Sequence, residues 1–320
     1  INCVLSKKYK TKATVGNLNN HIGVPLTLLS FTTETEIGIV EMGANHQKEI
    51  EFLCEIAQPD YGYITNFGKA HLEGFGGIEG VIKGKSEMYH YLQENKKTAF
   101  VNLDDPIQKE KSAALKNISF GLNNTSANVS IDDVKASPFV EVQYQNNKIT
   151  SHLIGLYNAN NINAAITIGK YFDVSDTEIN EAISSYIPEN NRSQLLHLNS
   201  NEIILDAYNA NPSSMEVAID NFIKLDKPNK TVVLGDMFEL GSESLQEHKN
   251  IVNLLLNQGL IQCFFIGKYF YRSKTSQNNF HFFETFEEFS QVFKDNSIQN
   301  QMMLIKGSRG MALERTLDLL

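Results

Sequence analysis

Two side chains that could do chemistry each follow a short apolar run of the sequence. Glu41 ends the run Ile-Gly-Ile-Val at 37–40, and His71 lies in a glycine-rich loop after the run YGYIT at 61–65. A magnesium ion that also holds phosphates needs only one or two protein ligands of the carboxylate type, because it keeps several waters. One interpretation is that Glu41 and His71 belong to a site for metal and phosphate. The other is that Glu41 is a solvated acid at a strand end and His71 is a surface histidine.

Asp206 closes a third apolar run, Ile-Ile-Leu at 203–205, and leads into Tyr-Asn-Ala-Asn-Pro at 208–212. The residues from Ser213 to Glu216 have the spacing of a capping box, which predicts a helix start. Capping accounts for the serine, the glutamate and Asn211. It leaves Asp206 and Asn209 without a structural role, so these two are candidates for binding.

The segment Lys306-Gly307-Ser308-Arg309-Gly310 follows the apolar run at 302–305 and precedes a predicted terminal helix. Backbone N–H groups at a helix start, with basic side chains beside them, bind carboxylates and phosphates well. The alternative is a basic surface turn.

Lys85 lies in the stretch GVIKGKS at 80–86, which looks like a phosphate-binding loop. Such a loop reads G-x-x-x-x-G-K-[ST], but position 79 is Glu, so the first glycine is one residue short. Apolar residues recur through the stretch at three- and four-residue spacing, which predicts one helix with Lys85 on its apolar face. Burial there would lower the pKa of the lysine. The alternative is a lysine whose stem packs while its amine reaches solvent.

The elements that position these residues repeat one order, a short apolar strand, a polar turn and then a helix, which predicts an α/β fold with mostly parallel sheets. Ligands collect at the carboxyl ends of such strands. Segments between about 118 and 155 alternate with period two and predict a small antiparallel or mixed sheet. The turn-rich residues 188–191 predict a hinge, which divides the chain into domains at 1–188 and 189–320.

Composition indicates an ordinary globular protein. The net charge of -9 and the lack of a basic patch argue against nucleic-acid or membrane-surface partners. The three cysteines are scattered and suggest neither disulfides nor zinc, so a cytoplasmic location is the simplest expectation. The first residue is Ile and the first segment reads as a helix already under way, so we expect the chain to be a fragment.

Seven ordered stretches of the chain resemble the Mur ligases, and among them the MurF type. They are TVGNLNNHIGVPLTLL, VEMGANHQKEI, ITNFGKAHLEGFGGIEGVIKGKSEMY, GLYNANNINAAI, ILDAYNANPSSMEVAI, VVLGDMFELG and IKGSRGMALE. The resemblance implies a central ATPase domain followed by a Rossmann-like domain. It also implies ATP-dependent joining of D-alanyl-D-alanine to UDP-N-acetylmuramoyl-tripeptide through an acyl phosphate, by an enzyme that is monomeric when full length.

The resemblance also implies roles for individual residues. Two magnesium ions would be held by Glu41, His71 and a carbamylated Lys85, which are the residues nearest the chemistry. Nucleotide contacts would come from Asn158, Asn161, Arg192, Asp206 and Asn209, with Tyr157 in place of the usual His of the family motif. Contacts with the incoming dipeptide would come from Asn211, Lys306, Ser308 and Arg309.

Two elements of the family are missing from the sequence, the phosphate loop and the UDP-binding domain that precede the first residues. We therefore expect the 320 residues to be inactive and poorly stable alone. Other readings remain open, namely another Mur-type or folylpolyglutamate-type amide ligase, or a non-catalytic binding module.

Overall fold

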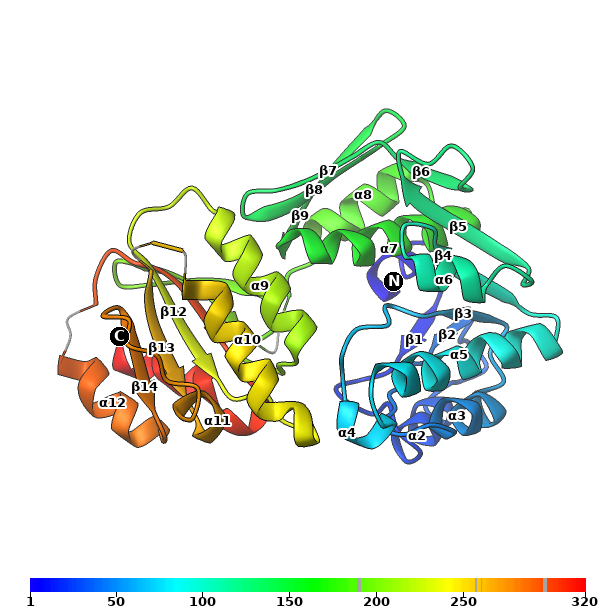
Figure 1. Cartoon of the computed structure of the whole chain (residues 1–320). Helices are drawn as coiled ribbons and strands as arrows, with labels where there is room; N and C mark the ends of the chain where they lie inside the picture. The colour runs from blue at the N-terminus through cyan, green and yellow to red at the C-terminus, as the bar shows by residue number, and fades with distance from the viewer. Residues whose placement is uncertain (189–190, 257, 260, 296–297) are drawn as a thin grey trace. The chain divides into compact units, whose positions relative to one another are not determined.

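The computed structural model describes residues 1–188, 191–256, 258–259, 261–295 and 298–320 (Figure 1). The chain divides into two compact units. One contains residues 1–152 and 156–186, and the other contains residues 153–155 and 187–320. The hinge expected at 188–191 includes Glu189 and Asn190, which lie outside the described residues.

The first unit contains three sheets. A parallel pair joins β1 (Thr11–Ala13) to β2 (Ile37–Ile39). A four-stranded parallel sheet has the order β3 (Tyr61–Tyr63), β4 (Thr98–Asn102), β5 (Asn117–Leu122) and β6 (Val129–Ile131). The third sheet contains β7 (Asp133–Ala136), β8 (Phe139–Tyr144) and β9 (Asn147–Ile154), with β7 antiparallel to β8. The helices are α1 (Asn2–Leu5), α2 (Gly23–Leu29), α3 (Glu49–Ala57), α4 (Leu72–Phe75), α5 (Ile78–Glu94), α6 (Pro106–Lys111), η1 (Leu156–Asn158), α7 (Ala159–Tyr171) and α8 (Asp176–Ser185).

The α/β prediction is confirmed, but the small sheet is smaller than expected. The segment at 117–122 pairs in parallel with β4 on one side and with the segment at 129–131 on the other, so only β7 to β9 form the separate sheet. Alternation of apolar and polar residues shows that one face of a strand is buried, and it does not show which strand lies alongside.

The second unit is built on a six-stranded sheet. Its order is β10 (Gln194–Leu198), β11 (Asn201–Asp206), β15 (Met302–Lys306), β12 (Lys230–Gly235), β13 (Gln262–Ile266) and β14 (Phe280–Phe283). Only β10 is antiparallel to its neighbour. The surrounding helices are α9 (Pro212–Lys224), α10 (Ser244–Leu256), α11 (Lys268–Tyr271) and α12 (Phe286–Asp295), with short 3₁₀ turns η2 (Gly241–Glu243), η3 (Arg309–Met311) and η4 (Leu313–Leu319).

Both faces of this sheet are covered. Phe289 and Phe293 of α12 pack against Ile203 and Ile305 in one apolar core, and Figure 1 shows α9 and α10 running alongside the strands. The strands β12 and β15 are buried along almost their whole length, as expected of a parallel sheet between helices. No helix in the described part of the chain has the length and apolarity needed to cross a membrane.

Candidate active site

Lys85 lies in the middle of α5, so the helix prediction for this stretch is confirmed. Its amine donates a hydrogen bond of 2.7 Å to the carbonyl oxygen of Asn66, in the loop that follows β3. Desolvation by burial lowers the pKa of Lys85 to about 8, although the nearby Asp105 acts in the opposite direction. A larger share of the side chain is therefore the neutral amine, which is the nucleophilic form.

The glycines beside Lys85 serve packing rather than phosphate binding. A Cβ atom at Gly84 would lie 2.5 Å from the ring of Phe75, and one at Gly80 would lie 1.8 Å from the carbonyl oxygen of Phe75. The glycines therefore let α5 lie directly against α4. This explains why the sequence imitates a phosphate loop without being one.

Glu41 and His71 lie in loops rather than at the last residues of strands. Glu41 comes two residues after β2, and its carboxylate accepts a 2.8 Å hydrogen bond from the side chain of Asn19. His71 precedes α4 and has a left-handed backbone, with φ 52°. Glu41 is exposed and His71 is half-buried, so both can be reached from solvent.

The segments that carry Glu41, His71 and Lys85 pack against one another. A Cβ at Gly74 of α4 would lie 2.2 Å from the carbonyl oxygen of Asn45, in the loop after Glu41. The side chain of Gln47 donates to the carbonyl oxygen of Phe75 at 3.4 Å. With the bond from Lys85 to Asn66, both loops are tied to α4 and α5.

The fit of this site to magnesium depends on Lys85. Among the described residues there is no group of three His, Cys, Asp or Glu side chains that could hold a metal ion. An unmodified lysine is a cation and a poor ligand, whereas a carbamate presents the oxygen atoms that magnesium prefers. Glu41, His71 and a carbamylated Lys85 would form a suitable donor set.

The two asparagines expected to approach a nucleotide lie at the start of α7. Asn158 is buried, and its side-chain oxygen accepts a 3.0 Å hydrogen bond from Asn161. They are therefore close together, as their spacing suggests.

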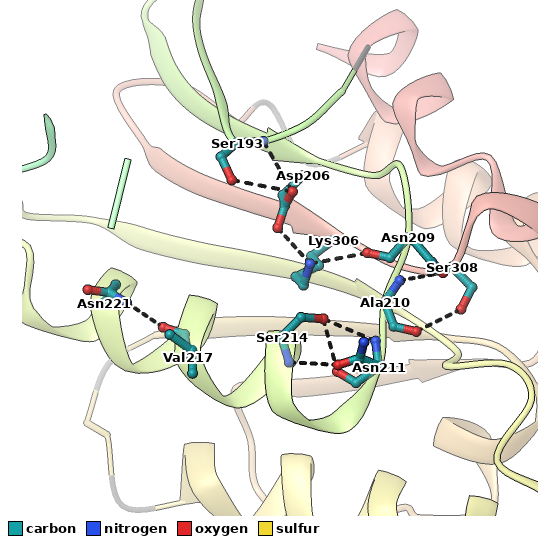
Figure 2. Close-up of polar contacts among 10 residues, drawn as sticks. All are labelled: Ser193, Asp206, Asn209, Ala210, Asn211, Ser214, Val217, Asn221, Lys306 and Ser308. Atoms are coloured by element: carbon teal, nitrogen blue, oxygen red, sulfur yellow. Dashed lines mark hydrogen bonds and ion pairs between the residues drawn. The ribbon is translucent and has the colours of Figure 1, made fainter. Parts of the chain in front are cut away.

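In the second unit, Asp206 and Lys306 lie opposite each other on neighbouring strands. The amine of Lys306 contacts the Asp206 carboxylate at 2.6 Å and the carbonyl oxygen of Asn209 at 3.2 Å (Figure 2). The second carboxylate oxygen of Asp206 accepts from the backbone of Ser193 at 3.1 Å. Lys306 is only 2% exposed, so the alternative of a surface turn is wrong for this residue.

Ser308 is also buried, and its hydroxyl is used within the protein. It accepts a 2.9 Å hydrogen bond from the backbone of Phe238 and donates at 3.3 Å to the carbonyl oxygen of Ala210. The segment that follows is 3₁₀ rather than the expected terminal α-helix, with η3 beginning at Arg309.

The capping box at the start of α9 is formed by Asn211 and Ser214, so the expectation of Ser213 and Glu216 is wrong. The side chain of Asn211 accepts from the backbone of Ser214 at 2.9 Å, and Ser214 Oγ accepts from the backbone of Asn211 at 3.1 Å. The reason is Pro212, whose fixed φ suits the first helical position and places the cap one residue before it. In Figure 2 this cap lies beside the loop that carries Asn209 and Ala210.

Three candidate side chains of the second unit remain exposed. Arg309 forms an ion pair of 2.7 Å with Glu314, and its side chain is 61% exposed. The guanidinium of Arg192 lies over the ring of Tyr208, 3.9 Å from its centre. Asn209 is exposed, and its side-chain oxygen accepts from the backbone of Ala210 at 2.8 Å.

Sequence reasoning missed Glu87, which is buried two residues after Lys85. Its carboxylate accepts backbone hydrogen bonds from Lys48 at 2.6 Å and Glu51 at 3.1 Å, at the start of α3. The sequence signal that could have indicated Glu87 is an acidic residue among the apolar positions of a predicted helix.

Comparison with known proteins gives one consistent result. The model of the Mur ligase middle domain matches residues 1–169, and that of the Mur ligase glutamate ligase domain matches residues 191–309. The UDP-N-acetylmuramoyl-tripeptide–D-alanyl-D-alanine ligase of Bacillus subtilis is 31% identical over 98% of this chain and 70% of its own length. That of Rickettsia prowazekii is also 31% identical, over 96% of this chain and 71% of its own.

Solved structures agree with these matches. MurF from Acinetobacter baumannii superposes with a TM-score of 0.88 at 28% identity, covering 99% of this chain and 72% of its own. MurF from Thermotoga maritima in complex with ADP has a TM-score of 0.82 at 23% identity, covering 99% of this chain and 74% of its own, and shows the shared fold.

Proposed function

The chain belongs to the Mur ligase family, and from this premise we propose that it carries out the MurF reaction. That reaction is the ATP-dependent joining of D-alanyl-D-alanine to UDP-N-acetylmuramoyl-tripeptide, a step in peptidoglycan precursor synthesis. Relatives of that name match nearly the whole chain. The structural observation that carries the proposal is Lys85, a half-buried lysine with a pKa of about 8 that is bonded to the loop leading to His71.

Each unit has a separate part in this proposal. Residues 1–188 would form the ATPase domain and residues 189–320 the ligase domain. When bound, ATP would supply the phosphoryl group that converts the tripeptide carboxylate to an acyl phosphate, with ADP as the leaving group, and two magnesium ions would offset the negative charge of the phosphates. Glu41, His71 and carbamylated Lys85 would hold these ions.

Binding of the nucleotide and the dipeptide would be shared among the remaining candidates. Asn158, Asn161, Arg192, Asp206 and Asn209 would contact the nucleotide. Arg309 is the exposed cation of the 306–310 loop and would meet the dipeptide carboxylate, since guanidinium groups bind carboxylates with two parallel hydrogen bonds. Lys306, Ser308 and Asn211 would hold the shape of the loops around it. The enzyme would act as a cytoplasmic monomer.

A substrate panel tests the reaction. Purified native gene product that contains these residues should release phosphate from ATP only with both UDP-N-acetylmuramoyl-tripeptide and D-alanyl-D-alanine. Parallel reactions should replace the dipeptide with diaminopimelate or L-lysine, or supply a folate with L-glutamate. Turnover with one of these and not with the dipeptide would overturn the proposal.

Arg309 provides a sharper test of the dipeptide site. Replacing Arg309 with Ala should raise the KM for D-alanyl-D-alanine at least tenfold, because a hydrogen-bonded charge contributes about 1.5–3 kcal/mol. Arg272→Ala, which removes an exposed arginine of the same unit, is the matched control and should leave that KM unchanged. Equal effects of the two substitutions would remove Arg309 from the site.

Carbamylation of Lys85 can be tested without turnover. The 320-residue chain, incubated with ¹³C-bicarbonate near pH 8, should show a carbamate carbon resonance that is absent from Lys85→Met. Lys83→Met, an exposed lysine on the same helix, should keep the resonance. A spectrum that is the same for all three proteins would show that Lys85 is not modified.

A further inference from the structure

A buried histidine and a buried aspartate lie behind the 306–310 loop, and the proposed reaction uses neither. His248 of α10 is fully buried, and Asp236, just after β12, is 3% exposed. The aspartate Oδ1 lies 3.4 Å from His248 Nε2. Burying two ionisable groups is costly unless their hydrogen-bonding atoms find partners.

His248 has partners on both ring nitrogens. Nε2 accepts a 2.9 Å hydrogen bond from the backbone N–H of Met237. Because Nε2 is an acceptor, Nδ1 carries the proton and donates it to the carbonyl oxygen of Ser244 at 2.6 Å. Burial lowers the pKa of His248, which favours this neutral form.

The side chains around the ring fix its position. It stacks on Tyr269 with ring centres 5.3 Å apart and meets Phe270 edge-on at 4.6 Å. The backbone N–H groups of these same two residues each donate a 3.0 Å hydrogen bond to the Asp236 carboxylate. His248 and Asp236 therefore lock residues 236–237 to α10 and α11.

Residues 236–238 support the 306–310 loop through direct contacts. The backbone of Ser308 donates to the carbonyl oxygen of Asp236 at 3.2 Å, and the backbone of Phe238 donates to the Ser308 hydroxyl at 2.9 Å. A Cβ at Gly310 would lie 2.7 Å from the Phe238 ring. Ser308 and Gly310, the residues on either side of Arg309, are thus both in contact with residues 236–238.

We propose that His248 and Asp236 are positioning residues that set the place of Arg309 for the incoming dipeptide carboxylate. They act through two steps, from the imidazole to the backbone of 236–238 and from there to Ser308 and Gly310. The role at the dipeptide rests on the proposed function, whereas the support of the loop does not.

The proposal depends on Nε2 of His248, which accepts the hydrogen bond from Met237. Two amide substitutions distinguish the role of this atom from that of Nδ1. In His248→Gln the amide reaches the place of Nε2 and its oxygen can accept from Met237. In His248→Asn the shorter amide reaches only the place of Nδ1. Both side chains are polar and neither is charged, so they differ mainly in the atom that matters.

Hydrogen exchange measures the support of the loop in the 320-residue chain. The amides of Met237, Phe238 and Ser308 should exchange at least tenfold faster in His248→Asn than in the unsubstituted chain, and within about threefold of it in His248→Gln. Unchanged exchange in His248→Asn would overturn the proposal.

A second measurement covers the case in which a variant does not fold. A ¹⁵N spectrum of the unsubstituted chain should show neutral, Nδ1-protonated His248 at pH 7, and a charged or Nε2-protonated ring would overturn it.

Steady-state kinetics of the native gene product measure the effect on the dipeptide. His248→Asn should raise the KM for D-alanyl-D-alanine about tenfold, while the KM for ATP and kcat stay within about twofold of the values of the unsubstituted enzyme. In His248→Gln the KM for D-alanyl-D-alanine should be close to that of the unsubstituted enzyme. Equal KM values in both variants and the unsubstituted enzyme would overturn the role at the dipeptide. If the exchange result holds but the unsubstituted enzyme does not use the dipeptide, the proposed function fails and the support of the loop stands.

Discussion

Lys85 has a structural cost that could serve the chemical role proposed for it. Its half-buried place on α5 disfavours the charged form, and its hydrogen bond to the Asn66 carbonyl oxygen holds the amine in one position. An amine that is partly neutral near pH 8 can add carbon dioxide, and the resulting carbamate would be the carboxylate ligand of the proposed magnesium site. The desolvation that disfavours the cation thus favours its conversion.

The cost predicts a change of stability with pH. The folded pKa of about 8 lies below the unfolded value, so the unfolded chain binds the extra proton between pH 10.5 and 8. The loss of folding free energy caused by burying the charged amine is fully present below pH 8 and is on the order of 3 kcal/mol. In buffer free of carbon dioxide, Lys85→Met should raise the free energy of unfolding at pH 7 by roughly 2 kcal/mol, allowing for the lost hydrogen bond.

Denaturant titrations at several pH values check this prediction. The advantage of Lys85→Met should shrink as the pH rises from 8, and above about 10.5 it should be replaced by a loss of about 1 kcal/mol from the missing hydrogen bond. Lys83→Met should change the unfolding free energy by less than about 0.5 kcal/mol, because that side chain is exposed. An advantage that is independent of pH would show that the charge is not the cause.

The position of a residue along its strand or helix was easier to predict than its burial and its partners. Asp206 was correctly placed at the end of β11, and the helical setting of Lys85 followed from spacing alone. The burial of Lys306 and Ser308 could not be read from the sequence, because their partners Asp206, Asn209, Ala210 and Phe238 lie far along the chain. Spacing describes neighbours within one element, and it says little about which loops meet.

At the scale of elements, α5 organises the first unit's candidate site. Lys85 binds the loop after β3, while Glu87 accepts from the backbone at the start of α3. The start of α3 lacks a side-chain cap of its own, and Lys48 there has a left-handed backbone with φ 73°. A carboxylate from another helix supplies the missing acceptor and suits the positive end of the α3 dipole.

Glu87→Gln should therefore destabilise the chain by about 1–3 kcal/mol, because the amide keeps one acceptor and presents a donor to the second backbone N–H. Glu94→Gln, at the exposed end of the same helix, is the control and should have little effect. Chemical denaturation measures both. Faster hydrogen exchange at the amides of Lys48 and Glu51 would locate the loss, and unchanged exchange there would assign it elsewhere.

The sheets show a further limit of sequence reasoning at this scale. The alternating segments at 117–122 and 129–131 gave the correct strands but the wrong sheet. Pairing depends on contacts between segments rather than on the pattern within one. The α/β class was predictable because the repeated order of strand, turn and helix restricts the arrangements that bury both faces of a sheet.

At the scale of the whole molecule, each compact unit has a core of its own. Leu92 lies in an apolar cluster with Ile64 and Val101 in the first unit, and Ile203 lies in one with Val233 and Phe289 in the second. Domains with separate cores can unfold as separate cooperative units. We therefore expect two calorimetric transitions for the chain.

A pair of matched substitutions assigns the two transitions. Leu92→Ala and Ile203→Ala each remove a fully buried aliphatic side chain, which costs about 2–5 kcal/mol and lowers a transition on the order of 10 °C. Leu92→Ala should lower one transition and leave the other in place, and Ile203→Ala should do the reverse. The double variant should show both shifts, because substitutions in separate cores that share no partners add. A single transition that moves equally with either substitution would mean that the two cores unfold as one.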